Sequence, residues 1–143
     1  MNLSAKTEYA CIAILELANQ HGSGGPIRLR RIAETHGIPS PFLVQIMLQL
    51  KAAGLVESTR GASGGYQLSR DPSQITLAEV REIVEGSTSG MVTSNLADTT
   101  SVTAALLAAW RQASAAEREV LAEITFAQLV DQVRDPTEKM YYI

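Results

Sequence analysis

The sequence predicts a mainly α-helical fold with a small β-hairpin wing, which is a winged helix-turn-helix followed by a long C-terminal dimerisation helix. Three observations lead to this prediction. Two short helical patterns meet at a glycine-containing turn, two short strand patterns flank a glycine-rich tip, and apolar residues then recur at spacings of three and four. We therefore expect a winged helix-turn-helix at residues 1–86, a flexible loop at 87–100, and a dimerisation helix with a C-terminal tail at 101–143.

The first helix is expected to begin after Ser4, a good N-cap residue, and to run to about His21. The glycine-rich segment at residues 22–26 then ends it. Between Tyr9 and Leu15 the chain is apolar on almost every side. Such a helix has to be buried against more than one neighbour, so we expect it at the centre of the fold.

Two shorter helices follow, joined by a tight turn. The first covers residues 29–36 and ends at Gly37, where a left-handed cap is needed. In the second, Ser40 is expected to be the cap and Pro41 the first helical residue, where a missing N–H has no cost. The pair indicates a helix-turn-helix. The buried face of the second helix should consist of Leu43, Ile46, Met47 and Leu50.

A glycine-rich hairpin directly follows these helices. Residues 55–59 and 66–69 are typical of short strands, and the tip between them contains Arg60 and three glycines. A helix-turn-helix with such a hairpin is a winged helix. In that fold the second helix of the motif enters the major groove of DNA, and the wing reaches the flanking backbone or the minor groove.

The C-terminal half begins with a predicted helix at residues 77–85, introduced by a Thr76–Glu79 capping box and a contact between Ile75 and Val80. After Gly86, residues 87–100 show no periodicity. One continuous helix is expected from residue 101 to 133, because its apolar stripe is too long for a small domain to cover alone. Its expected dimerisation residues are Leu106, Trp110, Ala113, Leu121 and Ile124, with Trp110 buried in the dimer.

Length, charge and cysteine content limit the classes of protein to which the chain can belong. The chain has 143 residues, of which 45% are hydrophobic, so it can bury one core but has no room for a second catalytic domain. The net charge of −3 divides into +3 for residues 1–70 and −6 for residues 71–143, which indicates a polyanion-facing N-terminal half.

No apolar run approaches the roughly 20 residues that span a bilayer. Since Cys11 is the single cysteine, we expect no internal disulfide and a cytoplasmic protein without membrane contact.

The candidate DNA-binding residues fall into three groups. Gln45 can bond adenine through two hydrogen bonds, Ser40 can reach phosphate or base, and the apolar Pro41 and Val44 can contact thymine methyl groups. Arg60 is placed to enter a narrow minor groove, next to glycines that allow close approach of the backbone. The wing glycines in question are Gly61 and Gly64. The third group contains the candidates for phosphate neutralisation, which are Arg28, Arg30, Arg31 and Lys51.

No enzyme motif is present. The sequence contains no nucleophile paired with a base, no motif with paired carboxylates and no metal-ligand spacing, so we expect a protein that is not an enzyme. Cys11 lies within the apolar run of the first helix, where a buried and unreactive thiol is expected. Cys11 and Glu8 nevertheless remain candidates for a sensor.

Several of these segments resemble one known family. They are L-S-x-K-x-x-Y-A at residues 3–10, G-L-V-E-S-x-R-G-x-x-G-G-Y-x-L at 54–68, and I-T-L-x-x-V at 75–80. Together they are similar to the Rrf-two family of winged-helix transcription regulators, which includes IscR, NsrR and CymR. The resemblance covers nearly the whole chain, and it implies a homodimer with crossing C-terminal helices, a central first helix and an operator with dyad symmetry.

The chain departs from this family in one respect. In its well-known members, three cysteines in the loop before the long helix bind an iron–sulphur cluster, in some cases with an acidic ligand at the position of Glu8. Here residues 87–100 contain neither cysteine nor histidine, and Asp98 is their single charged residue. The resemblance therefore implies a member that lacks the cluster-binding cysteines, with no cofactor and no metal.

The sequence is compatible with more than one function. The first interpretation is a sequence-specific homodimeric repressor of transcription that binds double-stranded DNA. The second is a protein-interaction module that regulates through a partner enzyme, and the third is a thiol-based redox regulator that uses Cys11. An unidentified small molecule bound near residues 87–100 could also supply the signal.

Overall fold

The fold of residues 2–22 and 24–135 is described by a computed structural model. Its elements are listed here in chain order: α1 (Ala5–Asn19), α2 (Leu29–His36), α3 (Ser40–Ala52), β1 (Val56–Thr59), β2 (Gly65–Leu68), a 3₁₀ turn η1 (Pro72–Gln74), α4 (Leu77–Glu85), α5 (Ser101–Glu123) and α6 (Phe126–Arg134). The predicted mainly helical winged fold is confirmed. Within the described residues, no helix is both long and apolar enough to cross a membrane.

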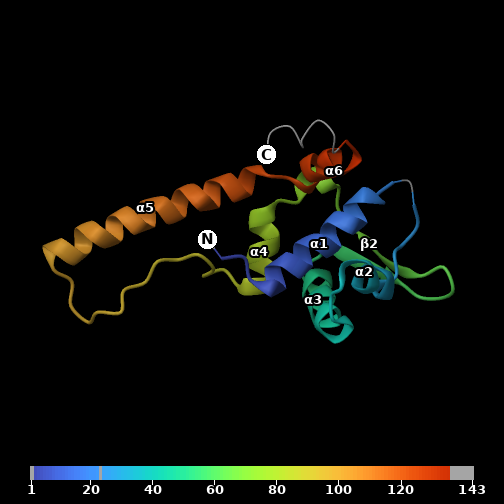
Figure 1. The fold of residues 1–143 in the computed structure, drawn as a ribbon, viewed down its shortest axis with the longest axis horizontal. Helices are drawn as coiled ribbons and strands as arrows, with labels where there is room; N and C mark the ends of the chain where they lie inside the picture. Colours follow the sequence, from blue (N-terminus) through green and yellow to red (C-terminus); the bar gives the residue numbers. More distant parts are fainter. Residues whose placement is uncertain (1, 23, 136–143) are drawn as a thin grey trace.

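Helix α1 lies at the centre of the domain, as predicted. It contacts α3, α4, α6 and β2, and Ala10, Ala13 and Ile14 on it are fully buried. Ser4 is its N-cap and accepts a hydrogen bond from the Thr7 amide at 3.1 Å. Figure 1 shows α1 passing between α4 and the helices α2 and α3. The small alanine side chains allow this close packing on several sides.

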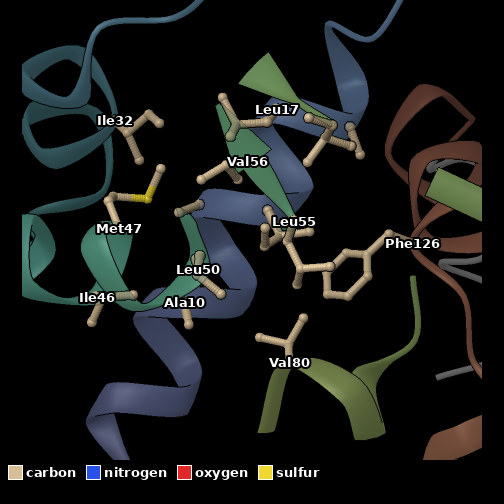
Figure 2. Close-up of a cluster of buried hydrophobic side chains, with 14 of the residues drawn as sticks. Ala10, Leu17, Ile32, Ile46, Met47, Leu50, Leu55, Val56, Val80 and Phe126 are labelled. Atoms are coloured by element: carbon tan, nitrogen blue, oxygen red, sulfur yellow. The ribbon is translucent and has the colours of Figure 1, made fainter. Parts of the chain in front are cut away.

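The core joins residues from every part of the winged domain. Figure 2 shows Leu50 of α3, Val56 of β1 and Val80 of α4 around α1, with the Phe126 ring pointing between Leu55 and Val80. Phe126 and Leu55 are completely buried. This core includes α6, which the predicted boundary at residue 101 had separated from the winged domain.

The expected single helix over residues 101–133 is wrong. Ile124 has an extended backbone with φ −87° and ψ 112°, and Thr125 starts α6 as its N-cap. Thr125 and Gln128 form a reciprocal capping box, a sequence signal that marks a helix start. Backbone hydrogen bonds to the segment at the start of α4 also stabilise the break. Leu77 N donates to Ile124 O at 3.1 Å, and Phe126 N donates to Ile75 O at 3.0 Å. The predicted tail at residues 136–143 lies outside the described residues.

Helix α5 is the element that stands apart. Within the described residues none of its side chains is buried, and its contacts are mainly with α4. Figure 1 shows it as a long arm whose N-terminal end projects away from the domain, with the loop from α4 running out to it. Residues 87–100 contain no helix or strand, in agreement with the irregular segment expected there.

Two helix starts differ in detail from expectation. Helix α3 begins at Ser40 itself with Pro39 as its N-cap, so Ser40 is not the cap and makes no capping hydrogen bond. At α4, Thr76 accepts from the Glu79 amide at 3.2 Å, but the Glu79 carboxylate pairs with Arg70 at 2.5 Å instead of returning to the cap. The predicted capping box is therefore half formed.

Candidate nucleic-acid interface

The helix-turn-helix is built by α2, α3 and the three residues between them. Gly37 ends α2 in the left-handed conformation with φ 67°, which glycine adopts without steric cost. The Ile38 amide then donates to Ala33 O at 2.9 Å, and the Ile38 side chain is buried. Burial of Ile38 between the two helices fixes the angle at which α3 leaves the turn.

Helix α3 turns an uncovered and largely apolar face outward. Pro41, Val44, Gln45 and Leu48 are exposed at helical spacing, while Leu43, Ile46, Met47 and Leu50 are buried. Leu48 is 50% exposed and was not among the predicted contacts, although it lies four residues after Val44 and seven after Pro41. Gln45 is the residue of these four whose side-chain amide is able to donate and accept hydrogen bonds. Such a face can read thymine methyl groups and one adenine edge.

Phe42 has a different role from its neighbours on α3. Its ring packs edge-on against Tyr9 of α1, with 5.5 Å between the ring centroids and 89° between the planes. Edge-to-face pairs of this kind contribute about 0.5–1.5 kcal/mol beyond the area they bury. Phe42 therefore orients α3 on α1.

The wing is a two-stranded antiparallel hairpin with register Val56↔Leu68 to Thr59↔Gly65. Glycine is required at positions 64 and 65 because other backbone atoms lie where a Cβ atom would be. A Cβ on Gly64 would lie 2.2 Å from Thr59 O, and one on Gly65 would lie 2.5 Å from Ile27 O. Ile27 and Tyr66 exchange backbone hydrogen bonds of 2.8 and 2.7 Å, so the base of the wing is joined to the segment before α2.

The predicted phosphate-binding cations have different surroundings. Arg30 pairs with Glu34 at 2.9 Å on the exposed side of α2, and the Lys51 amine donates to Ser58 Oγ at 2.7 Å. Arg28 donates to the wing tip. Within residues 2–22 and 24–135, Arg31 and Arg60 are exposed and take part in no ion pair or side-chain hydrogen bond. Among the described residues, Arg31 and Arg60 are thus the cations of this group without a side-chain partner.

The predicted dimerisation residues have unequal exposure. Trp110 is 60% exposed and Leu106 58% exposed, and Ala113 is also exposed. Leu121 is half-buried and borders a cavity against α4, while Ile124 lies at the break after α5. The outer part of α5 therefore presents uncovered apolar surface at Leu106 and Trp110, and Val120 near the C-terminal end of the helix is also 55% exposed.

The candidate sensor residues are also separated. Glu8 is exposed on α1, whereas Cys11 borders a cavity of about 240 Å³ between α1, α4, α5 and the start of the loop. Burial, together with the negative charge of Glu85, raises the pKa of Cys11 to about 11. Glu85 itself accepts a hydrogen bond from Thr7. Arg81 and Glu117, which form an ion pair of 2.7 Å, also line the cavity.

Cys11 and the residues of the loop between α4 and α5 do not fit an iron–sulphur cluster. Such clusters are held by several thiolates, and the chain has one cysteine, whose raised pKa keeps it protonated. Asp98 in the loop is a hard oxygen donor, which suits iron–sulphide poorly. In the part of the chain that the structure describes, no group of three or more His, Cys, Asp or Glu side chains is placed to hold a metal ion.

Comparisons with known proteins identify the family. The model of the Rrf2 family, described as an iron-dependent transcriptional regulator, matches residues 3–132. Rv1287 of Mycobacterium tuberculosis, named as a helix-turn-helix-type transcriptional regulator, is 37% identical over 131 residues, covering 90% of this chain and 81% of its own.

Solved structures agree with this match. CymR, the global cysteine regulator of B. subtilis, has a TM-score of 0.79 at 34% identity, covering 92% of this chain and 97% of its own. IscR of T. potens has a TM-score of 0.77 at 32% identity, covering 96% and 91%. These relatives are regulators and not enzymes. The chain belongs to the Rrf2 family of DNA-binding, winged helix-turn-helix transcription regulators.

Proposed function

We propose that this regulator is a homodimeric, sequence-specific repressor that binds a dyad-symmetric operator without an iron–sulphur cluster. The observation that carries the proposal is the uncovered outer face of α3 beside a wing that is tied to both helices of the motif. Lys51 at the end of α3 contacts Ser58 of β1, and Ile27 before α2 pairs with Tyr66 of β2. Recognition helix and wing therefore have a fixed relative position before DNA is bound.

The proposed contacts with DNA differ in chemistry between the major groove, the minor groove and the phosphate backbone. In the major groove, Gln45 bonds an adenine edge and the apolar side chains of Pro41 and Val44 pack against thymine methyl groups. Leu48 extends the same apolar contact. Arg60 enters the minor groove beside the recognition site. The remaining contacts go to the backbone, with Ser40, Arg31 and Lys51 at phosphates and with Gly61 and Gly64 allowing the wing to approach closely.

The dimer is proposed from α5. A helix of 23 residues without a buried side chain has to cover its apolar face with another surface. A second copy of this chain supplies that surface through the same residues, because a two-fold interface joins identical patches. Two winged domains related in this way would meet two half-sites spaced by about one or more helical turns of DNA.

The proposed signal does not act through iron or through the Cys11 thiol. A pKa near 11 leaves little thiolate at neutral pH, and the thiolate is the form that oxidants attack. The cavity bordered by Cys11, Arg81 and Glu117 connects α1 and α4 with α5. This position supports a small-molecule effector there in preference to a partner enzyme, because a bound ligand would touch both the DNA-binding domain and the dimerisation helix.

The DNA reading is tested with duplexes selected from a random-sequence library by the wild-type protein. In fluorescence anisotropy titrations, Arg60→Ala and Gln45→Ala should each weaken binding by about 1–3 kcal/mol. Gln45→Ala should also lower discrimination at one A·T position. Gln132→Ala, an exposed glutamine on α6, is the matched control and should have no effect. Unchanged affinity for Arg60→Ala and Gln45→Ala would contradict the proposed interface.

Repression is tested separately with a reporter gene placed under a promoter that contains the selected operator. The proposal expects lower expression when the regulator is present, and recovery of expression with Gln45→Ala. Higher expression in the presence of the wild-type protein would identify an activator instead.

A further inference from the structure

Arg28 makes contacts that differ from those of a phosphate-binding cation. It is the residue immediately before α2, and its Nη2 donates to two carbonyl oxygens at the wing tip, Gly61 O at 3.1 Å and Ala62 O at 2.5 Å. Sequence alone suggested that this guanidinium neutralises a DNA phosphate. From the contacts we infer that Arg28 is a positioning residue that holds the wing tip and acts on DNA affinity through Arg60. The inference rests on the proposed role of Arg60.

The wing tip needs such support because the strand ladder ends below it. The last paired residues of the hairpin are Thr59 and Gly65. Within residues 60–64, the Gly64 amide donates to Gly61 O at 3.1 Å, which closes the turn but does not join it to the domain. In the part of the chain that the structure describes, the hydrogen bonds that join residues 60–64 to another element are the two from Arg28.

The chemistry of the contact favours an ordered tip. Hydrogen bonds from a charged donor are stronger than those between neutral groups, and the Gly61 carbonyl accepts from both Arg28 and the Gly64 amide. Gly61 has φ 105° and directly follows Arg60. Fixing the Gly61 carbonyl therefore restricts the backbone that carries Arg60. A tip that is ordered in the free protein loses less conformational entropy when it binds.

The neighbouring Arg31 provides a matched control. It lies three residues later on α2 and is likewise exposed. Among the described residues it has no side-chain partner that would tie it to the wing. If proximity to DNA alone matters, Arg28→Ala and Arg31→Ala should behave alike. If Arg28 holds the wing, only Arg28→Ala should change the tip of the free protein.

The first measurement is amide hydrogen exchange of the free, full-length protein, read at Gly64. Because the Gly64 amide is protected by Gly61 O, we expect several-fold faster exchange in Arg28→Ala and wild-type exchange in Arg31→Ala. Arg28 is on the surface, so the thermal midpoint should stay within a few degrees of the wild type, which separates a local effect from unfolding. Unchanged Gly64 exchange in Arg28→Ala would overturn the inference.

The second measurement is a double-mutant cycle with Arg60→Ala, using the library-selected duplex at several salt concentrations. Arg28→Ala should weaken binding by about 3- to 10-fold, in line with the loss of an exposed charge-assisted hydrogen bond. The slope of log K against log salt should not change, and the effect should disappear in the Arg60→Ala background. Arg31→Ala should instead lower the slope by about 0.9 and remain additive.

An Arg28→Ala effect that is additive to Arg60→Ala and lowers the salt slope by about 0.9 would show a direct phosphate contact and overturn the inference. A different outcome would contradict the proposed function itself. If Arg60→Ala leaves affinity unchanged while Gly64 exchange still responds to Arg28→Ala, the contact orders the tip of the free protein but has no part in DNA binding.

Discussion

Truncation of Trp110 is expected to dissociate the dimer. The side chain is 60% exposed in the single chain, and a tryptophan buries at most about 250 Å², so about 150 Å² is available to a partner. At about 25 cal/mol per Å², covering this area contributes about 3–4 kcal/mol per side chain. A symmetric dimer uses the residue twice. Part of this is offset by the cost of ordering, so we expect Trp110→Ala to raise the dimer dissociation constant at least about 100-fold.

The assay uses the fact that Trp110 is the only tryptophan in the chain. Its emission in the wild type should shift to the red on dilution, at the same concentrations at which sedimentation velocity detects dissociation. Leu48→Ala, which shortens an apolar side chain on α3 that is 50% exposed, is the control and should leave the dimer intact. The reasoning would be refuted by emission independent of concentration together with a 15.4 kDa species alone at micromolar protein.

Three further predictions concern the fold and the thiol. Phe126→Ala should destabilise the protein by about 3–5 kcal/mol in urea unfolding, because the ring is fully buried in the core; a loss below about 1 kcal/mol would mean that α6 is not part of that core. Gly65→Ala should destabilise by more than Gly61→Ala, since both glycines have positive φ but only the Gly65 Cβ would collide with Ile27; equal losses would contradict the close approach. Alkylation of Cys11 by iodoacetamide should rise about tenfold per pH unit up to about pH 11, because the raised pKa leaves the thiol protonated below that pH, and a rate that levels off near pH 9 would contradict this environment.

Much of the winged domain could be predicted from sequence because its signals are local. Gly37 marks the end of α2, Ser4 marks the start of α1, and the glycines of the wing mark a hairpin tip. Each signal acts within a few residues, through the positive φ of Gly37 and Gly61 and through the Ser4 side chain on the Thr7 amide, and no long-range contact opposes it. The element type and the approximate boundaries therefore follow from these residues alone.

The features that the sequence did not predict, the helix break after α5 and the contacts of Arg28, depend on long-range contacts. The break between α5 and α6 carries a local signal at Thr125 and Gln128, but the apolar periodicity continues across it and outweighed that signal. What ends α5 is the pairing of Ile124 and Phe126 with the backbone around α4. The role of Arg28 could not be foreseen for a similar reason, because its partners lie more than 30 residues away in sequence.

The most direct test of the account is operator binding by protein purified without oxygen. Iron and acid-labile sulphide should be far below one per chain, and the affinity for the selected duplex should be the same before and after chelator treatment and in air. A brown protein with stoichiometric iron and sulphide, bleached by chelator with a change in DNA affinity, would contradict the account.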